Sequence, residues 1–323
     1  MERPLRPCAG CRTTRRRAAS TSSPLRCGVT VASMNGERAV HALDGLSVGD
    51  AFGQRFFGSG IALIESRDMP APPWRWTDDT AMALGIMEEL HRLGHIDRDA
   101  LARVFARHWY EEPARGYGGG AYRILEAIHQ GAPWWSVSRS AFGREGSKGN
   151  GAAMRVAPLG AWFSDDLDAV IAQARASAEV THAHPEGQSG AIAVALASAH
   201  ACRGLRGREL LEAVLAGTPD GETRDGVARA VQLSFEKPVA HAVALLGNGS
   251  EVTAPDTVPF SLWCAARHLN DFSEALWETV SGLGDRDTTC AIVGGIVAAA
   301  GTVIPPAWLA AREPLKLHDE KPS

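Results

Sequence analysis

Apolar residues recur at intervals of three and four along most of this chain, and runs that alternate β-branched apolar with polar residues are few. Such spacing places apolar side chains on one face of an α-helix, whereas alternation would indicate β-strands. The sequence therefore predicts an all-α fold. The expected helices cover residues 36–50, 78–93, 97–109, 118–130, 151–163, 166–180, 186–203, 206–215, 222–235, 256–268, 271–281 and 287–302.

Residues typical of helix ends support several of these assignments. Asp97, the segment Ser164-Asp165-Asp166, and Asp271 stand at the starts of expected helices, where a side-chain oxygen accepts hydrogen bonds from free backbone amides. Gly94 and Gly131 stand where helices should stop. No internal repeat or low-complexity linker interrupts the body of the sequence. We therefore expect one helical domain over residues 34–312 and a C-terminal tail over 313–323.

Charge is unevenly distributed along the chain. The formal net charge is -4, but residues 1–33 hold seven arginines and a single acid, which leaves 26 bases against 36 acids elsewhere. An acidic body argues against a broad nucleic-acid-binding surface and is compatible with bound divalent cations. Residues 1–33 lack the apolar stretch of a secretory signal, and Met34 looks like a more natural start. We therefore expect a disordered N-terminal extension on a cytoplasmic protein.

Other classes of protein find little support. The longest apolar run, residues 290–304, is too short for a membrane span and is interrupted by glycines, so we expect no membrane association. Cys8 and Cys11 would supply half of a zinc site, but no second pair follows at matching spacing. We expect a monomer.

Three oxygen-bearing side chains, Thr77, Asp78 and Asp79, open the helix expected over residues 78–93. Plain N-capping explains such residues when they are taken alone, since helix starts favour Thr and Asp. Capping needs only one such oxygen, however, and three in a row suit a hard cation such as Mg²⁺, which prefers carboxylate and hydroxyl ligands.

A second cluster, Asp285, Asp287 and Thr288, opens the last long helix. Flanking glycines permit a sharp turn that would bring both carboxylates to one ion, and capping by Asp287 is the simpler alternative. An Asp-x-Asp pattern also begins the nucleophile motif of haloacid dehalogenase phosphatases, but there it follows a hydrophobic strand. Here residues 278–284 end a helix, which disfavours that interpretation.

Together with other motifs in the same order, these clusters resemble the ADP-ribosylglycohydrolase family, which includes the ADP-ribosylarginine and ADP-ribosylserine hydrolases. The resemblance spans residues 37–310. Its motifs are Gly45-Leu46-Ser47-Val48-Gly49-Asp50-Ala51-Phe52-Gly53, Trp76-Thr77-Asp78-Asp79-Thr80, Arg115-Gly116-Tyr117-Gly118, Gly149-Asn150-Gly151-Ala152-Ala153-Met154-Arg155, Thr181-His182-Ala183-His184-Pro185, Gly284-Asp285-Arg286-Asp287-Thr288 and Ile304-Pro305-Pro306-Ala307-Trp308.

This resemblance implies a fold, a cofactor and a reaction. The family fold is a single-domain orthogonal bundle of helices whose central cleft holds two Mg²⁺ ions, with Mn²⁺ as an alternative. The implied reaction cleaves the glycosidic bond at the anomeric carbon of ADP-ribose and releases ADP-ribose from a modified protein, nucleobase or small molecule. The implied metal ligands are Thr77, Asp78, Asp79, Asp285, Asp287 and Thr288.

The resemblance also assigns residues to the substrate. Asn150, Gly151 and Met154 would lie along the ADP-ribose, with backbone amides near its phosphates, and His182 would lie in the cleft near the nucleotide. Tyr117 and Gly118 belong to a glycine-rich segment that would form a mobile loop at the cleft rim. From the residues alone, Asn150-Gly151 is an ordinary turn and the segment around Tyr117 only a long one.

Two positions depart from the family pattern. Phe57 stands where several members carry a glutamate with a catalytic or water-positioning role, and Arg286 lies between the two aspartates in place of a threonine. Either another acid serves, with Asp78 or Asp79 acting through a metal-bound water, or the chemistry is lost. Glu65, Glu112 and Glu145 are further candidate acids. The alternatives to an enzyme are a catalytically silent ADP-ribose-binding protein and a structural protein with the same fold.

Overall fold

The computed structural model describes residues 27–58 and 61–315. Within these ranges the chain forms sixteen α-helices and one 3-10 helix, with two isolated backbone bridges but no β-strand. The helices are α1 (Cys27–Gln54), α2 (Ile61–Ser66), α3 (Asp78–Leu93), α4 (Arg98–Glu111), α5 (Gly119–His129), α6 (Trp134–Arg144), η1 (Asn150–Ala152), α7 (Ala157–Trp162), α8 (Leu167–Glu179), α9 (Pro185–Cys202), α10 (Gly207–Gly217), α11 (Glu222–Gln232), α12 (Val239–Leu246), α13 (Ala254–Arg267), α14 (Phe272–Ser281), α15 (Arg286–Ala299) and α16 (Pro306–Ala311).

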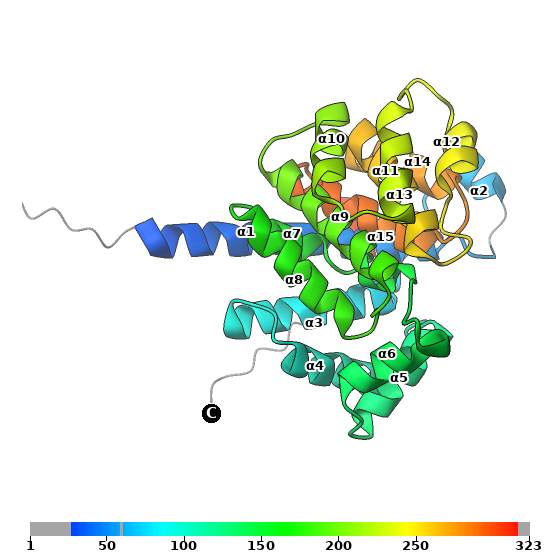
Figure 1. The fold of residues 1–323 in the computed structure, drawn as a ribbon. Helices are drawn as coiled ribbons and strands as arrows, with labels where there is room; N and C mark the ends of the chain where they lie inside the picture. The colour runs from blue at the N-terminus through cyan, green and yellow to red at the C-terminus, as the bar shows by residue number, and fades with distance from the viewer. Residues whose placement is uncertain (1–26, 59–60, 316–323) are drawn as a thin grey trace, which may run out of the picture.

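Helices α1 and α15 run side by side through the centre of the molecule (Figure 1). Their antiparallel contact is made through glycines spaced four residues apart on α1. A Cβ atom added at Gly49 would lie 2.6 Å from the carbonyl carbon of Cys290, and one at Gly53 would lie 2.6 Å from that of Arg286. The absence of side chains at these positions lets the two backbones approach closely, which brings the end of α1 beside the start of α15.

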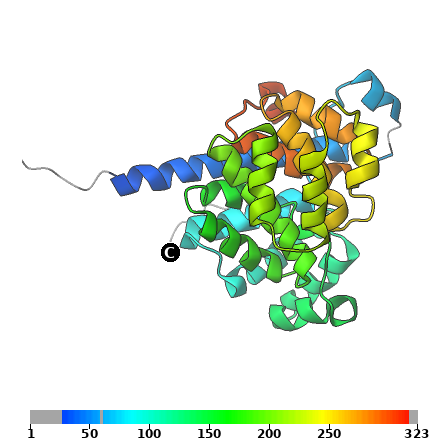
Figure 2. The same cartoon turned by 45° about the horizontal axis from the view of Figure 1, so that its top comes forward.

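The remaining helices pack on both sides of this central pair. Helix α9, which is buried along most of its length, contacts α7, α8, α10, α13 and α15. Helices α3 to α6 lie on the opposite side of the molecule from α10 to α14, as Figures 1 and 2 show together. The N-terminal ends of α3 and α15 therefore both reach the middle of the bundle.

A cluster of buried aromatic rings anchors the end of α1. Phe52 stacks on Trp308 with ring centroids 4.7 Å apart, and it meets Trp277 edge-on at 5.0 Å. Trp74, which precedes α3, lies 5.5 Å from Phe52. Since these rings come from α1, α14, α16 and the segment before α3, they fix the end of α1 relative to the start of α3.

The predicted all-α fold class is confirmed. Helix α3 has the expected bounds, and Asp97, Asp166 and Asp271 each cap a helix through the side chain. The helix expected over residues 151–163 is wrong in extent, because the chain forms η1 and then α7. Helices α2, α6, α12 and α16 were not predicted.

The ends of the chain only partly fall within the described residues. Helix α1 begins at Cys27, so the domain boundary expected at residue 34 lies inside a helix. The expectations for residues 1–26, including Cys8 and Cys11, concern residues outside the described part, as do those for 316–323. Glu313 donates its amide to the Trp74 carbonyl at 2.8 Å, so packing against the body continues past residue 312. No described helix is long and apolar enough to cross a membrane.

Candidate functional site

The centre of the candidate site is Asp50, in the last turns of α1. Its carboxylate accepts hydrogen bonds from the Thr77 amide at 2.9 Å and the Thr80 amide at 3.1 Å. The hydroxyls of the same two threonines also donate to it. Asp50 thus caps the free amides at the start of α3, although it is distant from them in sequence. Asp50 belongs to the motif of residues 45–53, but the sequence predicted no role for it.

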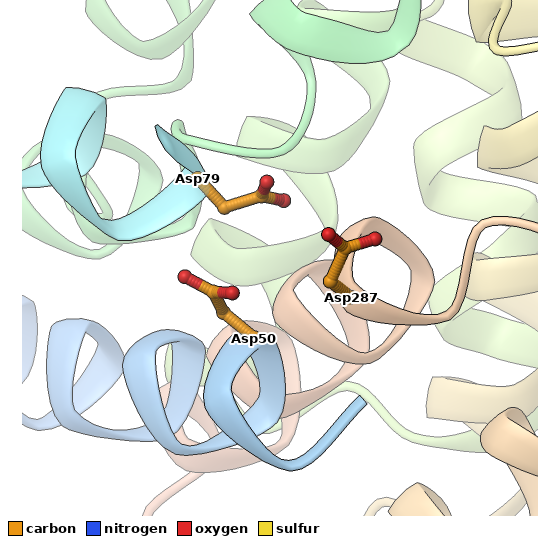
Figure 3. A group of neighbouring side chains, drawn as sticks. All are labelled: Asp50, Asp79 and Asp287. Atoms are coloured by element: carbon orange, nitrogen blue, oxygen red, sulfur yellow. The ribbon is translucent and has the colours of Figure 1, made fainter. Parts of the chain in front are cut away.

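Three carboxylates converge beside this cap. Oxygens of Asp50, Asp79 and Asp287 all lie within 4.8 Å of one another, and the side chains point toward each other from α1, α3 and α15 (Figure 3). Asp79 Oδ1 is buried and has no hydrogen-bond partner among residues 27–58 and 61–315. Burial, and then repulsion by Asp50 and Asp287, raises the pKa of Asp79 well above its usual value. A divalent cation would relieve that repulsion and satisfy the orphaned oxygen.

Two further carboxylates stand beside this group. Burial, followed by the charge of Asp50, raises the pKa of Asp78 to about 7. Asp285 occupies the N-cap position of α15, yet its side chain caps no amide; instead Asp285 Oδ2 accepts from Asn150 Nδ2 at 2.7 Å. Capping therefore does not explain Asp285. Asp287 is not the N-cap residue either, because it lies inside the first turn of α15. At α3 the capping interpretation does apply to Thr77, which accepts from the Asp79 amide.

A cavity of about 510 Å³ opens onto these acids. Its volume falls in the range of small-molecule sites. Thr77 and Tyr117 do not line the cavity. Both are buried, and the Tyr117 hydroxyl has no hydrogen-bond partner among the residues that the structure describes. The predicted site residues that do line it are Asp78, Asp79, Gly118, Asn150, Gly151, Met154, His182, Asp285, Asp287 and Thr288.

One wall of the cavity is the turn at Gly149–Gly151. The Asn150 amide group donates to Thr257 Oγ1 at 3.0 Å as well as to Asp285, so this side chain holds the wall to α13 and α15. A Cβ atom at either Gly149 or Gly151 would lie 3.2 Å from His182 Nε2. The absence of side chains at these two glycines therefore leaves room for the His182 imidazole against the turn.

The glycine-rich segment at the rim is held at its N-terminal end. Arg115 pairs with Glu112 at 2.7 Å and with Glu313 at 2.7 Å, and its guanidinium lies 3.4 Å from the centre of the Trp76 ring. The Arg115 carbonyl also accepts from the Asp78 amide at 2.8 Å. Beyond this anchor, Gly118, Gly119 and Gly120 line the cavity.

The two residues that depart from the family pattern, Phe57 and Arg286, are in contact with each other. The Arg286 guanidinium carbon lies 5.2 Å from the centre of the Phe57 ring, and the ring is 41% exposed. Neither residue lines the cavity. Arg286 therefore packs on the ring instead of reaching toward a ligand there.

The alternative acids differ in position. Glu65 is exposed on α2 and Glu112 is paired with Arg115, and neither lines the cavity, whereas Glu145 does. Glu251, which was not predicted from the sequence, also lines the cavity, on a loop next to Asp285. That loop has no helical periodicity or motif that would have marked it.

The site combines two acidic helix starts, a converging carboxylate from α1 and a glycine turn. The chain as a whole is similar to known proteins. Residues 32–320 match the model of the family described as ADP-ribosylglycohydrolase. This chain belongs to the ADP-ribosylglycohydrolase family. The predicted class of enzyme, a glycosidic-bond hydrolase of this family, is thereby confirmed.

Individual proteins are also similar to this chain. An uncharacterized protein of Archaeoglobus fulgidus is 32% identical over 84% of this chain and 90% of its own length. The ADP-ribosylhydrolase ARH3 of Gallus gallus is 31% identical over 72% of each chain. A solved structure titled "ADP-ribosylglycohydrolase-related protein complex" aligns with a TM-score of 0.64 and 28% identity, covering 87% of this chain and 94% of that one.

Proposed function

We propose that this chain is a Mg²⁺-dependent hydrolase that releases ADP-ribose from an ADP-ribosylated protein, nucleobase or small molecule. The observation that carries the proposal is the group of buried carboxylates beside a 510 Å³ cavity, in which one oxygen, Asp79 Oδ1, has no hydrogen-bond partner in the described part of the chain. Buried carboxylates that repel one another are costly unless a cation or protons compensate. The similarity to proteins named ADP-ribosylhydrolase supports the choice of ADP-ribose.

The donor set fits hard cations. Asp78, Asp79, Asp285, Asp287 and Thr288 offer carboxylate and hydroxyl oxygens to the cavity, which are the ligand types that Mg²⁺ and Mn²⁺ prefer. We add Asp50, which contributes an oxygen to the converging group, and we retain two ions as the expected number. Thr77 joins this set through Asp50, because its hydroxyl lies 2.9 Å from Asp50 Oδ1.

When bound, Mg²⁺ would supply positive charge that orients ribose oxygens and makes a water more acidic. The chain itself supplies the rest. A negative cavity favours the oxocarbenium-like charge that develops at the anomeric carbon. Gly151, Met154, His182 and Gly118 form the surface against which the nucleotide would lie. Glu145 and Glu251, which both line the cavity, are the candidates that replace the missing glutamate as a proton carrier.

The test is release of free ADP-ribose from arginine-, serine- and nucleobase-linked substrates, with and without Mg²⁺. Asp285→Asn removes one carboxylate with little change of shape, and we expect at least a 100-fold loss of metal-dependent release, in line with the loss of an electrostatic stabiliser. Asp220→Asn is the matched control, because the Asp220 side chain is 98% exposed. Release that is independent of metal and of Asp285 would contradict the proposal.

A catalytically silent ADP-ribose-binding protein is the second candidate, and Phe57 is the observation that favours it. The ring lies outside the cavity and cannot carry a proton. Binding of ADP-ribose without release from any of the three linkages would select this alternative. The expected monomeric state and cytoplasmic location stay predictions of the sequence.

A further inference from the structure

A fully buried arginine lies behind the cavity wall, and none of the described carboxylates is in hydrogen-bond contact with it. Arg155 is 0% exposed, and its guanidinium carbon lies 4.6 Å from the centre of the Phe105 ring. Its Nη2 donates to the Ser177 carbonyl at 2.7 Å, and its Nη1 donates to the Gly151 carbonyl at 3.2 Å. Burying such a group is costly, so its contacts point to a role in the neighbouring site.

Both terminal nitrogens of Arg155 also converge on one hydroxyl. Nη1 and Nη2 each lie 3.1 Å from Thr181 Oγ1. A guanidinium can only donate, so these two contacts use the accepting capacity of the hydroxyl oxygen. In the described part of the chain, the one remaining neighbour within hydrogen-bond distance of Thr181 Oγ1 is His182 Nδ1, at 2.7 Å.

This arrangement decides the direction of the last hydrogen bond. The Thr181 hydroxyl has a single proton, and the two Arg155 donors leave it to be given to His182 Nδ1. Nδ1 is therefore the acceptor, and a neutral imidazole must carry its own proton on Nε2. Burial, and then the charge of Arg155, lowers the pKa of His182 to about 3, so the ring is neutral at physiological pH.

We propose that Arg155 and Thr181 are positioning residues that fix His182 as the Nε2–H tautomer, so that the imidazole is a neutral hydrogen-bond donor to a ligand oxygen in the cavity. His182 lines the cavity, and its Nε2 lies beside the bare turn at Gly149–Gly151. Arg155 also holds the Gly151 carbonyl, so the donor and the turn are aligned by the same side chain. The role in ligand binding rests on the proposed function, whereas the tautomer does not.

The first measurement is the tautomer itself, by multiple-bond ¹H–¹⁵N spectra of the holoprotein with ¹⁵N-labelled histidine. His182→Gln assigns the signal by difference. We expect the Nε2–H pattern for His182 in the wild type and in Thr181→Ser, which keeps the hydroxyl. Thr181→Val has nearly the same shape but lacks the donor, so its His182 should show a mixture of tautomers. An Nδ1–H pattern in the wild type would overturn the proposal, whatever the fate of any variant.

The second measurement is the affinity for ADP-ribose, by calorimetry. Loss of one well-placed hydrogen bond weakens binding by about 5- to 10-fold, which we expect for Thr181→Val, with Thr181→Ser restoring the wild-type value. A Thr181→Val protein that has mixed tautomers but unchanged affinity would refute the role in ligand binding. If the wild type binds no ADP-ribose, the proposed function fails, and the tautomer spectra still decide the positioning.

Discussion

Gly49 offers a direct test of how the fold builds the site. In α1 this residue faces the backbone of α15, and an added Cβ atom would lie 2.6 Å from the Cys290 carbonyl carbon and 3.2 Å from the Ala291 amide nitrogen. Real Cβ contacts essentially never fall below 3.0 Å, so the two helices would have to move apart. Backbone atoms cannot rotate away as a flexible side chain could.

The expected cost of Gly49→Ala follows from two opposing effects. Overpacking of a tight core costs about 1–3 kcal/mol, and a rigid backbone obstacle places this site at the upper end. Alanine recovers about 1 kcal/mol through its better helix propensity. The net loss of unfolding free energy is therefore about 2 kcal/mol. For a domain of this size that lowers the melting temperature by about 3–4 °C.

Gly36→Ala is the matched control in the same helix. A Cβ atom there would lie 3.9 Å from the nearest atom, in the Trp162 ring, so only the gain in helix propensity applies. We expect Gly36→Ala to raise the unfolding free energy by about 0.5–1 kcal/mol. The assay is urea and thermal unfolding of both variants with and without Mg²⁺. Because Gly49 adjoins Asp50, its replacement should also reduce stabilisation by Mg²⁺.

Opposite signs for these two alanine variants are the expected result. Equal stability of Gly49→Ala and the wild type would refute the argument that close backbone contact between α1 and α15 requires glycine. Equal losses from both substitutions would show that the close contact with α15 is not the cause of the loss at Gly49.

Two further predictions concern charge. The pKa of Asp50 is raised to about 6 and that of Asp78 to about 7. Between pH 4 and 7 the folded metal-free protein therefore binds more protons than the unfolded chain, and it loses stability as these groups ionise. Thermal unfolding should show a larger stabilisation by Mg²⁺ over EDTA at pH 8 than at pH 5, and equal stabilisation at both pH values would contradict this. The Glu186 carboxylate accepts hydrogen bonds from the Glu222 and Thr223 amides, at 2.8 and 2.9 Å, at the start of α11. In urea unfolding, Glu186→Ala should lower the free energy of unfolding by about 1–3 kcal/mol, and Glu186→Gln should lower it less. An unchanged free energy of unfolding in Glu186→Ala would refute the capping role.

Local chemistry made the two acidic helix starts predictable. Asp79 and Asp287 belong to sequences in which several oxygens precede an apolar helix, and the structure brings these two side chains together. Asp50 has no comparable signal, because it lies inside a helix and its partners at Thr77 and Thr80 are distant in sequence. Its role depends on the approach of α1 to α15, which periodicity does not encode.

Secondary structure shows the same division between local and distant effects. Helix α3 was predictable because its cap, its apolar positions and its terminal Gly94 all lie within one stretch. Helix α6 was not, since Ser138 is its one buried residue and its last residues depart from helical geometry. The positions of Phe57 and Arg286 were also known, but their contact required the three-dimensional arrangement.

The polarity of the three helices explains why Asp50 needs so many donors. Asp79 and Asp287 lie in the first turns of α3 and α15, where the helix dipole favours negative charge. Asp50 lies near the C-terminal end of α1, where the dipole disfavours it. Two amides and two hydroxyls from the start of α3 offset this disadvantage and lower its pKa against the effect of burial. The start of α3 thus holds Asp50, the one acid of the three whose own helix dipole disfavours its charge. These hydrogen bonds keep the three carboxylates close together.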